Sequence, residues 1–306
     1  MFWIPPKELS GDLYRVAAMN TLRKSVIAGS WYPGAPSILR RDIENYFNSV
    51  PDLQLEGDVV GLIAPHAGYV YSGQVAANAY KLVRGKKYDA VIVVGPSHRV
   101  AFHGVSIFST GGYETPLGIV PVAEELAKKI KILSKTVADI PEVHSQEHSV
   151  EIQLPFLQVA LGDFSFIPLV MGDQGANTCQ EFAAALYEAA RGKKILIVGS
   201  SDLSHFYNYN MAKKLDAVVL RHLKEGDAVG LLESLENGTA EACGGGPMVV
   251  AMLVARMMNA NKAHLLKYAN SGDVTGDRSS VVGYTAAVYC KSRDLESPGS
   301  SRRVPH

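Results

Sequence analysis

Four unbroken runs of apolar residues constrain this chain most strongly, and helical patterns lie between them. The runs are short, rich in Val, Ile and Leu, and cover residues 59–65, 90–97, 164–172 and 194–201. Strands without alternating polar residues are buried on both faces, as in parallel sheets covered by helices. The pattern therefore predicts an α/β fold in which helices flank a central mixed, largely parallel sheet.

The chain is expected to form one domain. Its 306 residues would allow one large domain or two ordinary ones, but no segment has the composition of a linker and no repeat has a fixed period. We expect an N-terminal extension at 1–22, the α/β domain at 23–292 and a disordered tail at 293–306. Within the domain, residues 104–120 predict a hairpin, and residues 264–290 predict two strands around a polar loop.

Composition argues against several classes of protein. Thirty basic residues are balanced by thirty acidic ones without a dense run of either, so we expect no nucleic-acid partner. The longest apolar stretch, residues 248–255, is far shorter than the roughly 20 residues that span a bilayer, so we expect no membrane insertion. The N-terminus lacks the apolar core of a signal peptide, and three widely spaced cysteines do not suggest a disulfide scaffold. A cytoplasmic protein is expected.

Polar residues with metal-binding or proton-transfer chemistry follow three of the predicted strands. His66 follows the first run, His98 the second, and Asp202 and His205 the last. Ligands of open α/β sheets bind beyond the carboxyl ends of the strands. Any one of these histidines alone could be a structural hydrogen-bonding residue. Together they predict a shared site.

Two imidazoles and a third ligand form a minimal site for a divalent first-row metal. We predict His66, His98 and Cys243 as the ligands. Cys243 precedes three glycines and an apolar helical pattern, and the positive end of such a helix would lower the pKa of the thiol. The alternative is that Cys243 is a small buried residue at a tight turn.

The segment EHSVEIQLPFL supplies further candidates. On a helix, His148 and Glu151 would share a face, which suits a metal or acid–base role. The alternative is an exposed polar face above apolar residues. The predicted catalytic residues are His205, Asp202 and His148. The predicted further pocket residues are Tyr69, Tyr71 and Glu147, although Tyr71 would be a surface residue if it pointed away from the turn.

Several segments resemble those of the Memo family, also called AmmeMemoRadiSam system protein B. The resemblance runs in order from about residue 23 to 290, through RKSVIAGSWYPG, APHAGYVYSG, VGPSH, EHSVEIQLPFL, SSDLSH, EACGGGP and SGDVTGD. It implies a fold similar to that of class III extradiol ring-cleaving dioxygenases, which bind non-haem iron(II). It also implies that His66, His98 and Cys243 are the metal ligands, with Asp202 and His205 as neighbouring acid–base groups.

The sequence departs from the dioxygenases at the third ligand. Those enzymes hold iron with two histidines and a carboxylate, whereas Cys243 would supply a softer thiolate. A thiolate would retune an iron centre or favour copper or zinc, and could itself be oxidised. Iron(II) is the expected cofactor, with copper or zinc as alternatives.

The set of two histidines and a cysteine suggests a metal-dependent enzyme, of a redox or dioxygen-using kind, that acts on a small molecule. One alternative is a non-catalytic metal-binding, peptide-binding or adaptor protein that retains the pocket, because a shared fold does not guarantee turnover. Another is a metal-free enzyme with Cys243 as nucleophile and His205 as base. The name of the family implies an AMMECR-type protein and a radical-SAM protein as partners.

Overall fold

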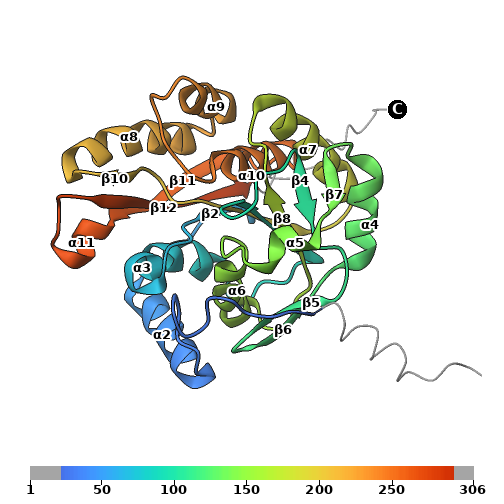
Figure 1. Cartoon of the computed structure of the whole chain (residues 1–306), viewed down its shortest axis with the longest axis horizontal. Helices are drawn as coiled ribbons and strands as arrows, with labels where there is room; N and C mark the ends of the chain where they lie inside the picture. The colour runs from blue at the N-terminus through green and yellow to red at the C-terminus, as the bar shows by residue number, and fades with distance from the viewer. Residues whose placement is uncertain (1–21, 293–306) are drawn as a thin grey trace, which may run out of the picture.

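The computed structural model describes residues 22–292 and arranges them around a large mixed sheet covered by helices (Figure 1). The strands of the large sheet are β2 (Asp58–Ala64), β3 (Ala90–Pro96), β4 (Val105–Ile107), β7 (Val137–Asp139), β8 (Phe166–Met171), β9 (Ile195–Ser200), β10 (His205–Tyr207), β11 (Lys262–Asn270) and β12 (Val281–Lys291). Their order is β10-β12-β2-β9-β3-β8-β4-β7, with β11 also paired to β12. The predicted fold class is confirmed. The predicted tail and all but the last residue of the predicted extension lie outside the described residues.

Helices cover both faces of this sheet. Those described are α2 (Pro36–Ser49), α3 (Tyr69–Tyr80), α4 (Glu124–Leu133), α5 (Pro141–Ser145), α6 (Leu154–Leu161), α7 (Ala176–Ala189), α8 (Tyr209–Glu225), α9 (Ala228–Glu236), α10 (Gly245–Met257) and α11 (Ser271–Thr275), with 3₁₀ turns η1 (Lys81–Val83) and η2 (Glu151–Gln153). Figure 1 shows α3, α2 and α6 on one side of the sheet and α10, α9 and α8 on the other. Within residues 22–292, no helix is long and apolar enough to cross a membrane.

The predicted hairpin is divided between two sheets. Strands β5 (Gly112–Thr115) and β6 (Gly118–Pro121) form an antiparallel hairpin, and β5 also pairs with β1 (Leu22–Arg23) in a separate three-stranded sheet. The preceding strand β4 instead pairs with β8 and β7 of the large sheet. The expected pair of C-terminal strands is present as β11 and β12, with α11 inside the polar loop.

The order of the central strands determines where the site can form. Strands β2, β9, β3 and β8 are parallel neighbours, and every residue of β3, β8 and β9 is buried. Strand β9 lies between β2 and β3, so the residues that follow these three strands meet at one edge of the sheet. Sequence segments more than 30 residues apart are thereby brought together.

A glycine lets a fourth segment reach this edge. Gly95 lies near the end of β3, and a Cβ at this position would overlap the Ser149 side chain. Ser149 Oγ also donates a hydrogen bond to the carbonyl of Pro96, at 2.9 Å. The backbone after α5 can therefore lie directly against the end of β3, where Glu147 and His148 enter the site.

A buried ion pair fastens the first described residues to the same segment. Arg23 pairs with Glu151, and their side chains are 3% and 0% exposed. The Arg23 guanidinium also donates to the carbonyls of Glu147 and His144, at 2.6 and 2.9 Å. Glu151 accepts further hydrogen bonds from Ser25 Oγ at 2.6 Å and Tyr32 Oη at 2.7 Å. Buried polar contacts therefore join residues 23–32 to residues 144–151.

We expect Glu151→Gln to destabilise the protein by about 3–5 kcal/mol, because it leaves the buried Arg23 charge without its counter-charge. Lys24→Ala is the control, because it breaks a surface ion pair between Lys24 and Glu114, which are 70% and 38% exposed. It should destabilise the protein by less than about 1 kcal/mol. Denaturant unfolding measures both changes. Equal, small losses in the two variants would contradict a structural role for the buried pair.

Candidate metal centre

Three histidines converge at the carboxyl edge of the sheet. His66 follows β2, His98 follows β3 and His148 lies between α5 and η2. Each offers a ring nitrogen, and these atoms lie within 4.8 Å of one another. The rings of His98 and His148 stack at 4.5 Å between centroids, and His66 stands edge-on to both. The arrangement has the donor types and the spacing that suit a metal ion.

The three imidazoles open into a pocket of about 420 Å³. Its walls come from the loop before α2, the first turn of α3, the strand ends and β12. The lining residues are Ser30, Trp31, His66, Ala67, Gly68, Val70, Tyr71, His98, His148, Asp202, His205, Val282 and Tyr284.

Hydrogen bonds fix the tautomer of His66. The hydroxyl of Ser200 donates to the carbonyl of Ser149 at 2.6 Å, so its oxygen is left to accept. It accepts from Gln153 Nε2 at 2.7 Å and from His66 Nδ1 at 3.0 Å. The proton of His66 is therefore on Nδ1, and Nε2 carries a lone pair. Burial, with a smaller effect of His148, lowers the pKa of His66 well below its usual value and keeps the ring neutral.

A carboxylate orients His98 in the same way. Glu147 is 1% exposed and its Oε1 lies 3.0 Å from His98 Nδ1. Glu147 also accepts from the backbone N–H groups of His98, His148 and Ser149. Burial alone would raise the pKa of Glu147, but the hydrogen bonds that it accepts from His98 and from those backbone donors outweigh it and lower the pKa to about 2. His98 thus donates from Nδ1 and leaves Nε2 available, as metal-ligating histidines commonly do.

His148 is the least restrained of the three. Its Nδ1 is buried without a hydrogen-bond partner, and although it lies 3.4 Å from Glu147 Oε1, the geometry is not that of a hydrogen bond. Burial lowers its pKa to about 4. The Trp31 ring packs on it at 4.3 Å between centroids. An unpaired buried nitrogen costs free energy unless a further partner binds, so this atom fits a site that is completed by a ligand.

Cys243 contacts His66 and is not part of the cluster of three histidines. Its Sγ is 3.1 Å from His66 Nε2 and 3.6 Å from the carbonyl of Asp202, and it accepts the Asp202 N–H at 3.3 Å. The expectation of a lowered thiol pKa is wrong for this structure. Burial raises the pKa of Cys243, and the Asp202 carboxylate raises it further. The thiol therefore holds its proton and can donate it to the free nitrogen of His66.

Asp202 and His205 complete the pocket. Asp202 is 4% exposed, and its Oδ1 accepts the backbone N–H of His66 at 2.8 Å. Burial raises the pKa of Asp202 to about 7, so its carboxyl changes protonation near neutral pH. His205 lines the pocket wall, and burial lowers its pKa. All six predicted catalytic and metal-binding residues therefore meet here, but Cys243 reaches only His66 among the histidines of the cluster.

The remaining predicted pocket residues occupy different places. Tyr71 lines the pocket and is 41% exposed. Tyr69 is 4% exposed and points into the core, where its hydroxyl donates to the carbonyl of Ile152. Glu147 lies behind His98. The expected helical face is absent, because residues 147–150 form a turn between α5 and η2 and Glu151 faces Arg23 instead of the pocket.

Sequence reasoning missed the supporting residues. Trp31, Val282 and Tyr284 line the pocket, and Ser200 and Gln153 orient His66. Ser200 stands in the same strand-end motif as Asp202, so its position could have indicated it. Gln153 stands shortly after His148 in the EHSVEIQLPFL segment, but its contact with Ser200 could not be read from the sequence. Trp31, Val282 and Tyr284 lie far from the three clustered histidines in sequence, and no local pattern distinguishes them.

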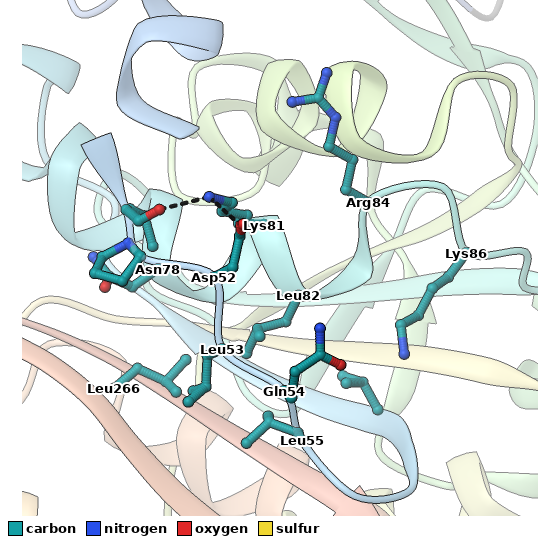
Figure 2. A pocket seen from close by; sticks show the side chains of 13 residues that line it. Asp52, Leu53, Gln54, Leu55, Asn78, Lys81, Leu82, Arg84, Lys86 and Leu266 are labelled. Carbon is teal, nitrogen blue, oxygen red and sulfur yellow. Dashed lines mark hydrogen bonds and ion pairs between the residues drawn. The ribbon is translucent and has the colours of Figure 1, made fainter. Parts of the chain in front are cut away.

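Two other features do not contribute to this site. His222 lies near Glu225 and Asp227, but its Nδ1 is bonded to Asp227 and its Nε2 lies 3.0 Å from Ser234 Oγ. A larger cavity of about 550 Å³ lies near the other end of β2, beside the end of α3. Figure 2 shows Lys81 at its edge, paired with Asp52 at 2.7 Å. None of the predicted site residues is among the described residues that line this cavity.

Comparison with known proteins agrees with the resemblance seen in the motifs. The family model for "Memo-like protein" matches residues 23–288. A "MEMO1 family protein" from Methanobrevibacter smithii is 36% identical over 88% of this chain and 99% of the relative. One from Methanococcoides burtonii is 37% identical over 87% and 99%. The solved structure of uncharacterized protein JW3007 from Escherichia coli K12 aligns with a TM-score of 0.47 at 14% identity, over 76% of this chain and 100% of that one; we draw nothing from a likeness at this level.

The lowered pKa of His148 predicts a pH dependence of stability. Between pH 6.5 and 4 the unfolded chain binds a proton at this residue and the folded chain does not, so stability falls as the pH falls. The contribution is on the order of 3 kcal/mol. Denaturant unfolding of metal-free protein at several pH values should give a flatter profile for His148→Gln than for wild type. Identical slopes would show that His148 is not buried as a neutral base.

Proposed function

Because the chain belongs to the Memo family, we propose that its histidine pocket binds a first-row metal ion and that the protein is a redox enzyme that uses dioxygen to act on a small molecule. The observation that carries the metal site is the orientation of His66 and His98. Each donates from Nδ1 to a buried acceptor, Ser200 or Glu147, so each Nε2 lone pair is left for another partner. Histidines that bind a metal ion usually donate their other ring N–H to such an acceptor.

The third ligand has two candidates in this pocket. His148 lies within reach of both other histidines and has an unsatisfied ring nitrogen. Cys243 contacts His66 and would have to lose its proton to bind a metal, which an adjacent cation promotes. We propose Cys243 as the ligand and His148 as the neighbouring acid–base group. We propose iron(II) as the ion, with copper or zinc favoured if the thiolate dominates the site.

The side chains of the pocket can themselves bind and release protons. A bound ion would supply Lewis acidity and redox capacity. Asp202, with its pKa of about 7, can give or take a proton near neutral pH. His205, lowered in pKa by burial, is a base at the same wall. Trp31 and Tyr284 supply aromatic walls to the pocket, from the loop before α2 and from β12.

Metal analysis of anaerobically purified protein tests the site. We expect about one equivalent of iron, copper or zinc in wild type and none in His66→Ala or His98→Ala, because each variant removes a ligand. Glu147→Gln should weaken metal binding by about 10- to 100-fold, since it loosens the orientation of His98. Ile132→Ala, a change at an 83% exposed side chain of α4, is the control. Wild-type protein with background metal and no response to these substitutions would refute the proposal.

Cobalt(II) substitution identifies the third ligand. A thiolate ligand adds a sulfur-to-cobalt charge-transfer band, which we expect in wild type and in His148→Gln but not in Cys243→Ala. The opposite result, with no band in wild type and loss of cobalt from His148→Gln, would assign the third position to His148.

Oxygen uptake separates an enzyme from a binding protein. With a panel of catechols and other small molecules, wild-type protein should consume oxygen, and Cys243→Ala should not. If no substrate supports uptake by metal-loaded protein, the alternative of a non-catalytic metal- or peptide-binding protein is favoured. An AMMECR-type protein and a radical-SAM protein are the proposed partners, and the cytoplasm is the proposed compartment.

A further inference from the structure

Phe206 has a backbone conformation that its side chain disfavours. Its φ is +65°, and Asn259 is the other described non-glycine residue with a positive φ. Asparagine tolerates the left-handed region, but a bulky aromatic residue there is a true outlier, because its Cβ approaches the following carbonyl oxygen. Such outliers persist when the surrounding structure imposes them, and they are enriched at functional sites.

The strain arises from a bulge between β10 and β12. His205 pairs with Val282 and Tyr207 pairs with Val281, so Phe206 is an extra residue on β10 without a partner. A bulged residue in the left-handed region is normally glycine. Bulges of this kind often lie beside active sites, where they redirect a side chain. Here the bulge immediately follows His205, which lines the histidine pocket.

The fold gains little from the phenylalanine. Its side chain is 76% exposed, so the ring buries little apolar surface. Its recorded aromatic contact is with the His205 ring, edge-on at 5.6 Å between centroids. Glycine would relieve the backbone, and a polar residue would suit the exposure. Neither local conformation nor packing accounts for an aromatic side chain at this position.

The position of the ring accounts for it better. The ring lies edge-on to His205, which lines the pocket, and at the first turn of α3 the same pocket is lined by Val70 and Tyr71, which are 67% and 41% exposed. Exposed apolar side chains therefore line the pocket at α3 and stand next to its His205 wall in β10. The inner end of the pocket carries the histidines and Asp202. This polarity suits a ligand with a polar end and an apolar end.

We infer that Phe206 forms a binding subsite outside the histidine pocket that takes a flat apolar group of the ligand. The ligand is then an elongated small molecule, whose polar, metal-directed end enters the pocket and whose apolar ring lies against Phe206. The inference rests on the proposed metal site for the placement of the polar end. It assigns Phe206 to ligand specificity and leaves proton transfer to the residues inside the pocket.

Thermal unfolding of metal-free protein tests whether the Phe206 ring contributes to the stability of the fold. Phe206→Gly removes both the ring and the strain, whereas Phe206→Ala removes only the ring. We expect the glycine variant to melt about 2 °C above the alanine variant and at or above wild type. A melting temperature several degrees below wild type in both variants would show that the ring stabilises the fold, and would overturn the inference.

Ligand binding tests the subsite itself, with imidazole and 4-phenylimidazole as probes of cobalt(II)-loaded protein. Both probes can bind the metal, but only the second carries a flat apolar group. We expect 4-phenylimidazole to bind wild type at least 10-fold more tightly than imidazole, and Phe206→Ala to reduce that ratio by about 2- to 10-fold. Ile132→Ala, which changes an exposed apolar side chain on α4, should leave the ratio unchanged.

The two proposals fail in different ways. If cobalt does not bind, the metal site is refuted, and the subsite falls with it because the polar end of the ligand has no metal to bind. If cobalt binds and the ratio is the same in wild type and Phe206→Ala, the subsite is refuted and the metal site stands.

Discussion

Two buried carboxylates, four residues apart in a segment with little regular structure, hold the pocket together. Glu151 balances Arg23 and ties the first described residues to the base of the site. Glu147 accepts three backbone N–H groups and orients His98. Burying a charge is unfavourable unless it is paired or hydrogen-bonded. Glu151 has the charge of Arg23, and Glu147 has the backbone N–H groups and the ring N–H of His98. Because Arg23 and His98 come from distant parts of the chain, the bonds that stabilise the carboxylates also help to set the positions of the histidines.

The sequence was most informative where local pattern and topology agree. His66, His98, Asp202 and His205 were predicted from their places after apolar strands, and parallel strands do bring such residues to one edge. The prediction for Glu151 failed because helical spacing was assumed for residues that form a turn, which is fixed by tertiary contacts with Arg23 and β3. The raised pKa of Cys243 could not be predicted either, because it depends on burial by neighbours that are remote in sequence.

The thiol of Cys243 couples metal binding in this pocket to pH. Without a metal, Cys243 can donate its proton to His66 Nε2, so the lone pair that would bind an ion is occupied by a weak hydrogen bond. Metal binding would replace that bond and release the thiol proton, which makes affinity dependent on pH. A carboxyl group at the same place would lose its proton at a lower pH than a thiol, so the coupling to pH would be weaker. The change of ligand type thus alters how binding responds to its surroundings, as well as which ion is preferred.

Both ends of the described chain contribute walls to the pocket. Trp31 comes from the first residues after β1, and Val282 and Tyr284 come from β12, the last strand, which pairs with β2 inside the sheet. During synthesis, therefore, the histidines emerge from the ribosome long before the strand that closes the pocket. A chain that terminates before β12 would lack a wall of the pocket and leave β2 without its antiparallel neighbour, exposing an edge prone to aggregation. The pocket is therefore complete only after β12 has been synthesised and has paired with β2.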